Sequence, residues 1–406
     1  AALAIVLCGA LFCFANPPLQ VPDEAAHFLR SYSLSQGRLT FDHDRLYPDD
    51  VAKLVESFPG AWVAAHTSQG LTYTEEGEER SYTTAGYALK QRGENGRVES
   101  IADGFSAYFD GESAEEAVGE PYFFMTLSML PQALGILAAR ILGFKALGCL
   151  YAARLANLAA YAALCWLALK NCRRYKPVFT AFMLLPLSLY MAASVSYDAT
   201  LLGFYYLVAS FYCKDEILDR DIAVFIVAFL MMNLAKPYIS LLWVVLPLVL
   251  PRPAWKTRVK KWQLAVGCLV GGLALGKLFD WYGTAFRFNY PYVGRQIEGA
   301  AEVPQLLGIL ANPFRYAAVL LGTFYENDFF LGQLGVFGAL DLEVPFISLV
   351  SPLVLLFAAA LSVHEKSSLK PMPAFGLGAL SIVYMAGAAT AMYITSTPVG
   401  MIRIIG

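Results

Sequence analysis

The sequence predicts an all-α polytopic integral membrane protein, and both its composition and the distribution of its charges indicate this class. Of its 406 residues, 57% are hydrophobic and only 15% are charged, whereas soluble domains carry about a quarter charged residues. The mean hydropathy is +0.52. Long apolar runs alternate with short loops that hold most of the Lys and Arg. This pattern excludes a water-soluble core.

The apolar segments predict about nine spanning helices, because a bilayer core needs roughly 20 apolar residues in helical form. The predicted spans are residues 1–14, 147–169, 177–195, 199–213, 222–235, 238–250, 264–280, 344–363 and 373–394. Residues 122–144 and 304–325 are also apolar, but they contain Pro131 and Asn312-Pro313. We expect these two segments to form interfacial helices at the outer surface.

The short basic loops fix the predicted orientation, since Lys and Arg accumulate on the cytoplasmic side. These loops are residues 170–176, 214–220, 252–261 and 364–370. The long hydrophilic stretch at residues 16–120 then lies on the extracytoplasmic face.

The resulting organisation has five parts. They are a first transmembrane helix (1–15), an extracytoplasmic subdomain with interfacial helices (16–144), transmembrane helices 2–7 (145–282), an extracytoplasmic loop with an interfacial helix (283–343), and transmembrane helices 8–9 with the start of an external loop (344–406). The chain begins inside one predicted span and ends just after another, so we expect a piece of a longer protein.

Several classes of site are not expected. All seven Cys lie in or beside apolar segments and no CxxC occurs, so neither disulfides nor a structural zinc site is predicted. The sequence has no Walker A, GxGxxG, GxSxG or HExxH motif, and its basic loops are too short to bind nucleic acid.

The most informative motif follows the first predicted helix. Pro22 precedes Asp23, Glu24, His27 and Arg30, which fall at helical spacing and place a carboxylate beside the imidazole. Two interpretations are open. The carboxylates can act as a general base or as metal ligands, or Asp23 can complement the dipole of an interfacial helix while Arg30 meets lipid head groups.

Two further motifs lie on the same predicted face. Asp198 closes the segment Ser194-Val195-Ser196-Tyr197-Asp198 between two apolar runs, and Lys236 precedes Pro237 and Tyr238. A carboxylate near a bilayer is usually functional or paired, but Asp198 can also simply cap a helix. Lys236 can hold a phosphate as a point charge or extend its amine to the membrane interface.

Together these motifs resemble a domain-of-unknown-function family of bacterial polytopic membrane proteins. The resemblance is carried, in order, by the PxxxPDExxHFxR block at residues 18–30, Arg154-Leu155 with Asn157, Ser-x-Ser-x-Asp at 194–198, Lys236-Pro237-Tyr238, the glycines at 332 and 335 with Asp341 and Pro345, and Thr397-Pro398-Val399-Gly400. It covers nearly the whole chain.

That family in turn resembles the GT-C superfamily of glycosyltransferases, which implies a function. Members transfer sugars from polyprenyl-phosphate donors on the extracytoplasmic face, here to cell-envelope glycans or lipid-linked acceptors at the bacterial cytoplasmic (inner) membrane. The resemblance places Asp23-Glu24 at a first acidic motif and Asp198 at a second.

The resemblance also implies roles for individual residues. Asp23 would act as base in an inverting displacement, with Glu24 and Asp198 beside it. A cation would stabilise the charge on the leaving phosphate. This cation would be Lys236 or Arg295, or, in a metal-dependent enzyme, Mg or Mn held by Asp23, Glu24 and Asp198. His27, Arg30, Tyr238 and Arg295 complete the expected substrate-binding set.

Two other functions stay open from the sequence. A transporter or flippase of lipid-linked glycans predicts mid-membrane charges and inverted repeats, neither of which is evident. A non-catalytic scaffold for envelope assembly predicts that Asp23 and Asp198 are replaceable. The sequence leaves the oligomeric state open.

Overall fold

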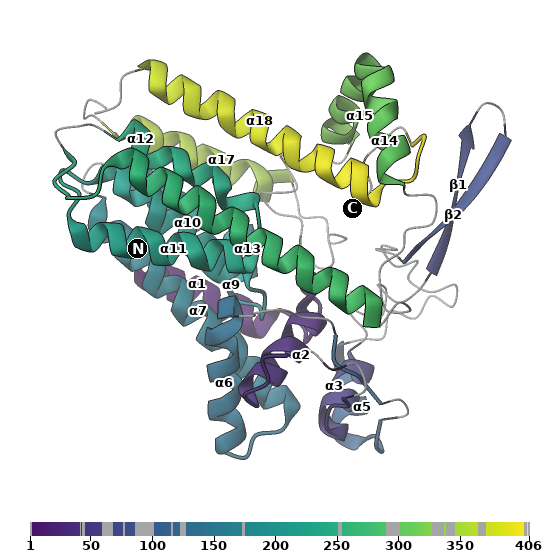
Figure 1. The fold of residues 1–406 in the computed structure, drawn as a ribbon. Helices are drawn as coiled ribbons and strands as arrows, with labels where there is room; N and C mark the ends of the chain where they lie inside the picture. Colours follow the sequence, from purple (N-terminus) through teal and green to yellow (C-terminus); the bar gives the residue numbers. More distant parts are fainter. Residues whose placement is uncertain are drawn as a thin grey trace.

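The computed structural model describes residues 2–40, 42, 45–58, 68–75, 78–85, 101–114, 117–121, 127–172, 175–250, 254–289, 301–326, 337, 346–363, 371–401 and 404. These residues are predominantly helical (Figure 1). The elements are α1 (Ala2–Ala15), α2 (Glu24–Ser35), α3 (Asp49–Ser57), β1 (Ser68–Glu75), β2 (Glu78–Ala85), α5 (Ile101–Asp110), η1 (Leu127–Met129), α6 (Leu130–Ile141), α7 (Ala146–Asn171), α8 (Lys176–Met183), α9 (Pro186–Ala192), α10 (Asp198–Ser210), η2 (Phe211–Cys213), α11 (Asp219–Ala235), η3 (Ile239–Val245), α12 (Leu246–Val249), α13 (Lys261–Asn289), α14 (Glu302–Ala311), α15 (Pro313–Glu326), α17 (Phe346–Leu361) and α18 (Pro371–Ser396).

Three of the described helices are long and apolar enough to cross a bilayer. These segments are Ala146–Asn171 in α7, Lys261–Ala285 in α13 and Phe375–Thr395 in α18, and the bent pair α14–α15 brings the number to four if it is counted as one span. Their outward side chains are apolar, as in Val270 of α13 and Ile382 of α18, which are both exposed. The chain is therefore membrane-embedded, but length and composition do not confirm nine spans.

Two predicted spans are interrupted. The segment 177–195 is divided into α8 and α9 just before Pro186, because proline has no N–H for the helix ladder and disfavours helical backbone in the residue before it. The segment 238–250 begins at Tyr238 with a φ of 66° and continues as η3 and the short α12. Each is helical but shorter than a single straight span.

The two segments predicted to be interfacial helices also differ from a straight span. In residues 304–325, α14 and α15 meet at Asn312 with a bend of 108°, where Pro313 starts the second helix. Within 122–144, α6 packs closely along α7: a Cβ added to Gly135 would lie 2.5 Å from the carbonyl oxygen of Ala152.

One element departs from the all-α prediction. β1 and β2 form a two-stranded antiparallel hairpin in which Ser68 pairs with Ala85 and Glu75 with Glu78. Both strands are rich in Thr and Tyr, which favour extended backbone. The hairpin projects from the molecule near the C-terminal end of α18 (Figure 1).

The basic loops meet at one end of the helical stack. Lys214 donates to Asn171 at 3.4 Å, which joins the first loop to the second. The amide of Ile217 donates to Ala254 and that of Lys256 to Ile217, which joins the second loop to the third. The prediction that these loops share a face is confirmed for these three, and the fourth, 364–370, lies outside the described residues.

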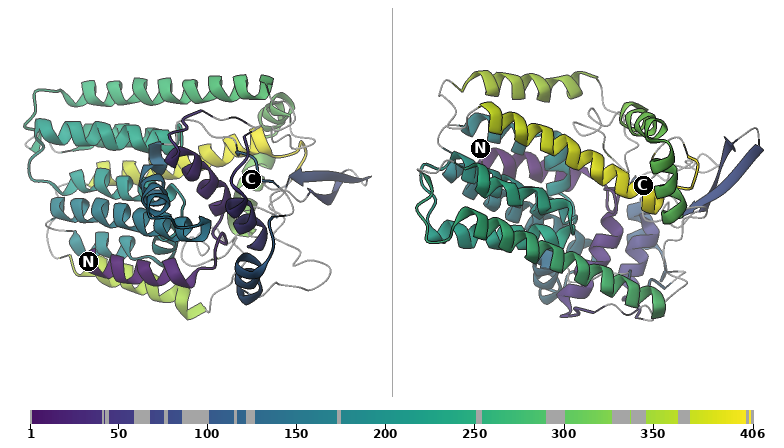
Figure 2. Two further views of the ribbon diagram at one scale, coloured as in Figure 1. Left: turned by 90° about the horizontal axis from the view of Figure 1, so that it is seen from below. Right: turned by 45° about the horizontal axis from the view of Figure 1, so that its top comes forward.

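The elements of the predicted extracytoplasmic loops gather at the opposite end. Figures 1 and 2 show α2, α3, α5, the hairpin, α14 and α15 together at the end where α18 finishes. The packed core beneath α2 contains Phe28, Leu29 and Val195 with residues of α6 and α7. This core fixes the candidate site at that end of the helical stack.

Candidate functional site

The first part of the site is a tight turn between α1 and α2. Asp23 precedes α2 with a φ of 56° and a ψ of 10°, a left-handed conformation that few residues other than glycine adopt. The amide of Glu24 donates to the carbonyl of Val21, and the amide of His27 donates to that of Asp23. These two hydrogen bonds fix the backbone on both sides of Asp23.

The carboxylate of Glu24 forms a buried, two-pronged ion pair with Arg154 of α7. The guanidinium donates from Nε to Oε1 of Glu24 at 2.8 Å and from Nη2 to Oε2 at 2.6 Å, and both side chains are fully buried. The guanidinium also donates to the carbonyls of Cys13, Asn16 and Pro17. All five of its N–H groups therefore have acceptors, and the end of α1 is tied to the start of α2.

The second part of the site is the segment 194–198, which three polar side chains hold in place. Asn157 Nδ2 donates to the carbonyls of Ser194 and Ser196 at 2.7 and 2.8 Å. Gln132 Nε2 donates to the carbonyls of Val195 and Ser196, and the amide of Val195 donates to Glu24 Oε1 at 3.1 Å. Glu24 thus links the turn at Asp23 directly to the segment that ends in Asp198.

Asp198 begins α10 and forms an ion pair with Lys236, which follows α11. The two charged atoms lie 2.9 Å apart, and the side chains keep 24% and 36% of their exposure. Ser196 Oγ also donates to Asp198 Oδ2 at 3.1 Å. The second and third sequence motifs therefore meet although 38 positions separate them in the chain.

Tyr197 lies at the centre of the assembled groups. Its ring stacks on that of His27 with centroids 4.7 Å apart, and the Lys236 amine lies 5.5 Å from its centroid. Burial raises the pKa of its hydroxyl, with Asp198 and Asp23 adding to the increase and Lys236 and Arg30 opposing it. Tyr197 thus lies between His27 of the first motif and the Lys236 amine that pairs with Asp198.

The protonation states of His27 and Lys236 follow from their surroundings. Burial, together with the charges of Arg30 and Lys236, holds the pKa of His27 well below its usual value, so the imidazole is neutral at pH 7. Burial acts against the charged form of Lys236, but Asp198 and the nearby tyrosines outweigh it and raise its pKa. The site thus presents a permanent cation beside a neutral imidazole.

Protonation of His27 should make the stability of the protein depend on pH. Below about pH 6.5 the unfolded chain binds a proton that buried His27 resists, so the free energy of unfolding should fall as the pH is lowered, by about 1.4 kcal/mol per pH unit. We expect the thermal midpoint of the purified protein to drop between pH 7.5 and 5.5, and the drop to be smaller in His27→Gln. Equal pH dependence in the two proteins would contradict this assignment.

The predicted metal set is not assembled. Both oxygens of Glu24 are bound by Arg154, and among the described residues no three His, Cys, Asp or Glu side chains gather closely enough to hold a metal ion. Glu24 does not fit the predicted catalytic or metal-binding role, because its buried carboxylate is enclosed by donors. It instead positions Asp23 and the 194–198 segment.

The remaining predicted residues have separate positions. Tyr238 turns to α13, where its hydroxyl donates to Asp280 Oδ2 at 2.7 Å and its ring occupies the space beside Gly276. Arg30 contributes its charge near His27 and Tyr197. Arg295 lies outside the described residues.

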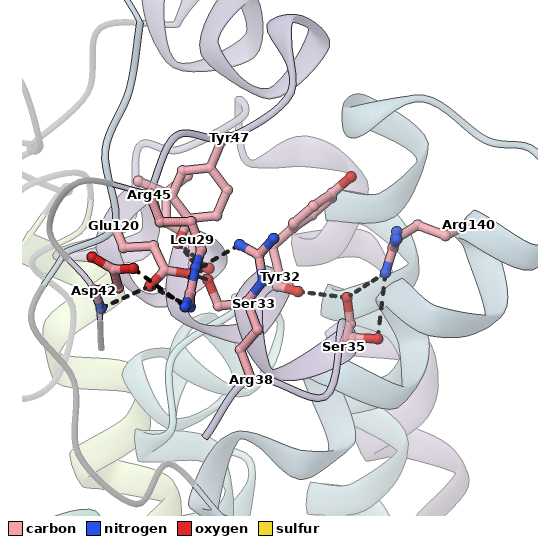
Figure 3. Close-up of polar contacts among 10 residues, drawn as sticks. All are labelled: Leu29, Tyr32, Ser33, Ser35, Arg38, Asp42, Arg45, Tyr47, Glu120 and Arg140. Atoms are coloured by element: carbon pink, nitrogen blue, oxygen red, sulfur yellow. Dashed lines mark hydrogen bonds and ion pairs between the residues drawn. The ribbon is translucent and has the colours of Figure 1, made fainter. Parts of the chain in front are cut away.

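A second buried carboxylate, that of Glu120, holds the segment around residue 120 against α2 and the residues that follow it (Figure 3). Glu120 is fully buried and pairs with Arg38 and Arg45, each at 3.2 Å. It also accepts from Ser33 Oγ at 2.7 Å, and Ser33 in turn lies 2.8 Å from the Tyr47 hydroxyl. This network ties the end of the long hydrophilic stretch to α2 and to the segment that follows it.

We expect Glu120→Ala to lower the free energy of unfolding by roughly 2–3 kcal/mol, because it removes the acceptor of two cations and a buried hydroxyl. Glu112→Ala is the matched control, since Glu112 is exposed in the same segment, and it should change stability by no more than about 0.5 kcal/mol. Thermal unfolding of the purified variants measures both. Equal midpoints for the two variants would show that the Glu120 network does not hold this region.

Sequence reasoning alone missed several residues that build the site. Arg154 and Asn157 entered only through the resemblance, and Gln132, Tyr197 and Glu120 were given no role. The available signal was the charge of Arg154 within an apolar helix, because such a charge requires a buried partner.

A comparison with known families identifies one match. The family described as "Predicted membrane protein (DUF2142)" matches residues 6–406, which confirms the resemblance drawn from the motifs. No curated protein and no solved structure matches the chain.

Proposed function

The chain belongs to the DUF2142 family of predicted membrane proteins, and from this premise we propose that it is a glycosyltransferase of GT-C type. In this proposal it transfers a sugar from a polyprenyl-phosphate donor to a cell-envelope glycan or a lipid-linked acceptor. The site faces the extracytoplasmic side of the bacterial inner membrane, and the nine apolar segments span it.

One observation carries the proposal: three motifs from distant parts of the chain meet around Tyr197. Asp23 follows α1, Asp198 begins α10 and Lys236 follows α11. The ring of His27 in the first motif stacks on Tyr197, and the Lys236 amine lies 5.5 Å from the centroid of that ring and 2.9 Å from Asp198. A carboxylate can serve as a general base and a cation can stabilise a leaving phosphate, and both groups are partly exposed here.

Asp23 is the proposed general base. An acceptor hydroxyl is a weak nucleophile, so a carboxylate must take its proton as its oxygen attacks the anomeric carbon. The side chain of Asp23 is partly exposed, in contrast to the enclosed Glu24. As the new glycosidic bond forms, the bond from the anomeric carbon to the phosphate oxygen breaks, and this single displacement inverts the configuration.

Lys236 is the proposed cation for the leaving phosphate. An ammonium group has three donors, and one is directed at Asp198. With 36% of its side chain exposed, Lys236 can also approach a phosphate oxygen and stabilise the charge that develops on it. Asp198 then positions the amine, and its own charge keeps that amine protonated.

Comparison of a deletion strain with its complemented strains tests this function. Mass spectrometry of envelope glycans and lipid-linked intermediates should show that deletion removes one sugar mass while the acceptor lacking that sugar accumulates. Lys236→Met should reproduce the defect, whereas Lys145→Met, an exposed lysine before α7, should restore the wild-type glycans.

The rival functions predict different results. Accumulation of a complete lipid-linked glycan would indicate a transporter or flippase. A defect on deletion that Lys236→Met fully repairs would favour a scaffold.

A further inference from the structure

The helices α11 and α13 leave an open apolar groove between them. Their inner sides pack with η3 and α12 in one hydrophobic core, and the groove, with a volume of about 310 Å³, lies on the other side. Ile226 and Leu230 line it and are 39% and 37% exposed. Among the described lining residues none is charged, so the groove is suited to an apolar occupant.

This α11–α13 groove begins at the end of the helical stack where the basic loops meet. Ile217 and Trp255 form a parallel bridge just before the two helices, so α11 and α13 start side by side and run in the same direction. The lining residues extend over eight positions of each helix, from 222 to 230 and from 263 to 271. At about 1.5 Å per residue this is about 12 Å, nearly the depth of one leaflet of a bilayer core about 30 Å thick.

The mouth of the groove is positive. Arg258 and Lys260 flank Val259, which lines the groove, and Arg220 lies in the first turn of α11. All three cations are exposed, and none forms an ion pair within the part of the chain that the structure describes. Residues 214–221 and 254–261, which surround the mouth, contain six Lys and Arg against four Asp and Glu. An excess of two positive charges therefore stands where the groove opens.

We propose that the α11–α13 groove holds an acyl chain of one anionic glycerophospholipid, with the lipid headgroup at the basic mouth. Arg258 and Lys260 supply cations for the headgroup phosphate. The lipid belongs to the leaflet next to the basic loops, which is the cytoplasmic one by the positive-inside rule.

The depth of the groove favours a lipid over a helix of another chain. A spanning helix needs an apolar contact face across the whole bilayer core, whereas this groove covers about one leaflet. An acyl chain joined to an anionic headgroup matches both the apolar walls and the positive mouth. The proposal is independent of sugar transfer, because the groove opens at the end of the helical stack opposite the candidate site.

Gly267 allows the groove to be filled without disturbing the packed core. It lines the groove, and a Cβ added to it meets no atom within 4 Å. Gly378 of α18 also has open space at its Cβ but does not line the groove. Each of the two glycines lies six or seven positions after the first residue of its helix, and both helices are candidate spans. Gly267→Leu and Gly378→Leu are therefore a matched pair.

Native mass spectrometry of the purified protein, titrated with phosphatidylglycerol and with zwitterionic phosphatidylcholine, tests the proposal. We expect one tightly bound phosphatidylglycerol in the wild type and in Gly378→Leu, and at least about tenfold weaker binding in Gly267→Leu. Thermal midpoints of all variants verify folding.

Neutralising the mouth tests the headgroup separately from the chain. Arg258→Gln combined with Lys260→Gln should weaken phosphatidylglycerol binding by at least about tenfold, because each cation near a headgroup strengthens binding several-fold. Phosphatidylcholine should bind the wild type at least about tenfold more weakly than phosphatidylglycerol. Lys145→Gln, which removes an exposed lysine before α7, should bind phosphatidylglycerol as the wild type does.

Three results would overturn the proposal. The first is unchanged phosphatidylglycerol binding in Gly267→Leu. The second is equal affinity of the wild type for the two lipids, which would show that the cations do not select an anionic headgroup. The third is a dimer that takes up no lipid and that Gly267→Leu converts to a monomer, which would assign the groove to a second copy of the chain.

Discussion

Replacing Arg154 with Leu should destabilise the protein by roughly 3–5 kcal/mol, because it leaves the buried carboxylate of Glu24 without its cation. The change also removes the donors to the carbonyls of Cys13, Asn16 and Pro17. Total stabilities of domains are about 5–15 kcal/mol, so the variant should show a much lower thermal midpoint and reduced abundance in the membrane.

A double-mutant cycle isolates the ion pair from these other contacts. Glu24→Gln keeps an oxygen for the Val195 amide but removes the charge, so the combination with Arg154→Leu should be less damaging than the sum of the single changes. We expect a coupling energy of about 1–3 kcal/mol from thermal or denaturant unfolding. Strict additivity would mean that Arg154 acts through its backbone contacts alone.

Several of the helices could be predicted from the sequence, and the three motifs were expected on one face of the molecule. Apolar length locates α1, α7, α13 and α18, and the basic loops correctly predict which helix ends meet. Both signals are local properties of the chain. The break between α8 and α9 could also have been predicted, since Pro186 marks the start of α9. The length of the apolar run alone does not reveal this break.

The roles of the two neighbouring carboxylates could not be predicted in this way. Asp23 and Glu24 are adjacent in sequence, yet Glu24 is buried against Arg154, which lies 130 positions away, while Asp23 stays partly exposed. Helical spacing places a carboxylate near His27 but does not indicate which carboxylate is enclosed. The partners of Glu120, at 75–87 positions away, are equally remote from any local pattern.

Asp23→Asn should abolish sugar transfer while leaving the protein folded. Asparagine tolerates the left-handed backbone that Asp23 adopts, so the substitution removes the proton acceptor and keeps the shape. General-base catalysis contributes typically 10²–10⁴-fold, and we expect a loss of about this size. Asp110→Asn is the matched control, because Asp110 is exposed at the end of α5 on the same side of the molecule.

The most direct measurement is quantitative mass spectrometry of envelope glycans from a deletion strain that expresses each variant at wild-type level. The account predicts that the sugar missing in the deletion strain stays missing with Asp23→Asn and returns fully with Asp110→Asn. If Asp23→Asn restores the sugar as well as the wild type does, Asp23 is not the base and the proposed transfer mechanism is contradicted.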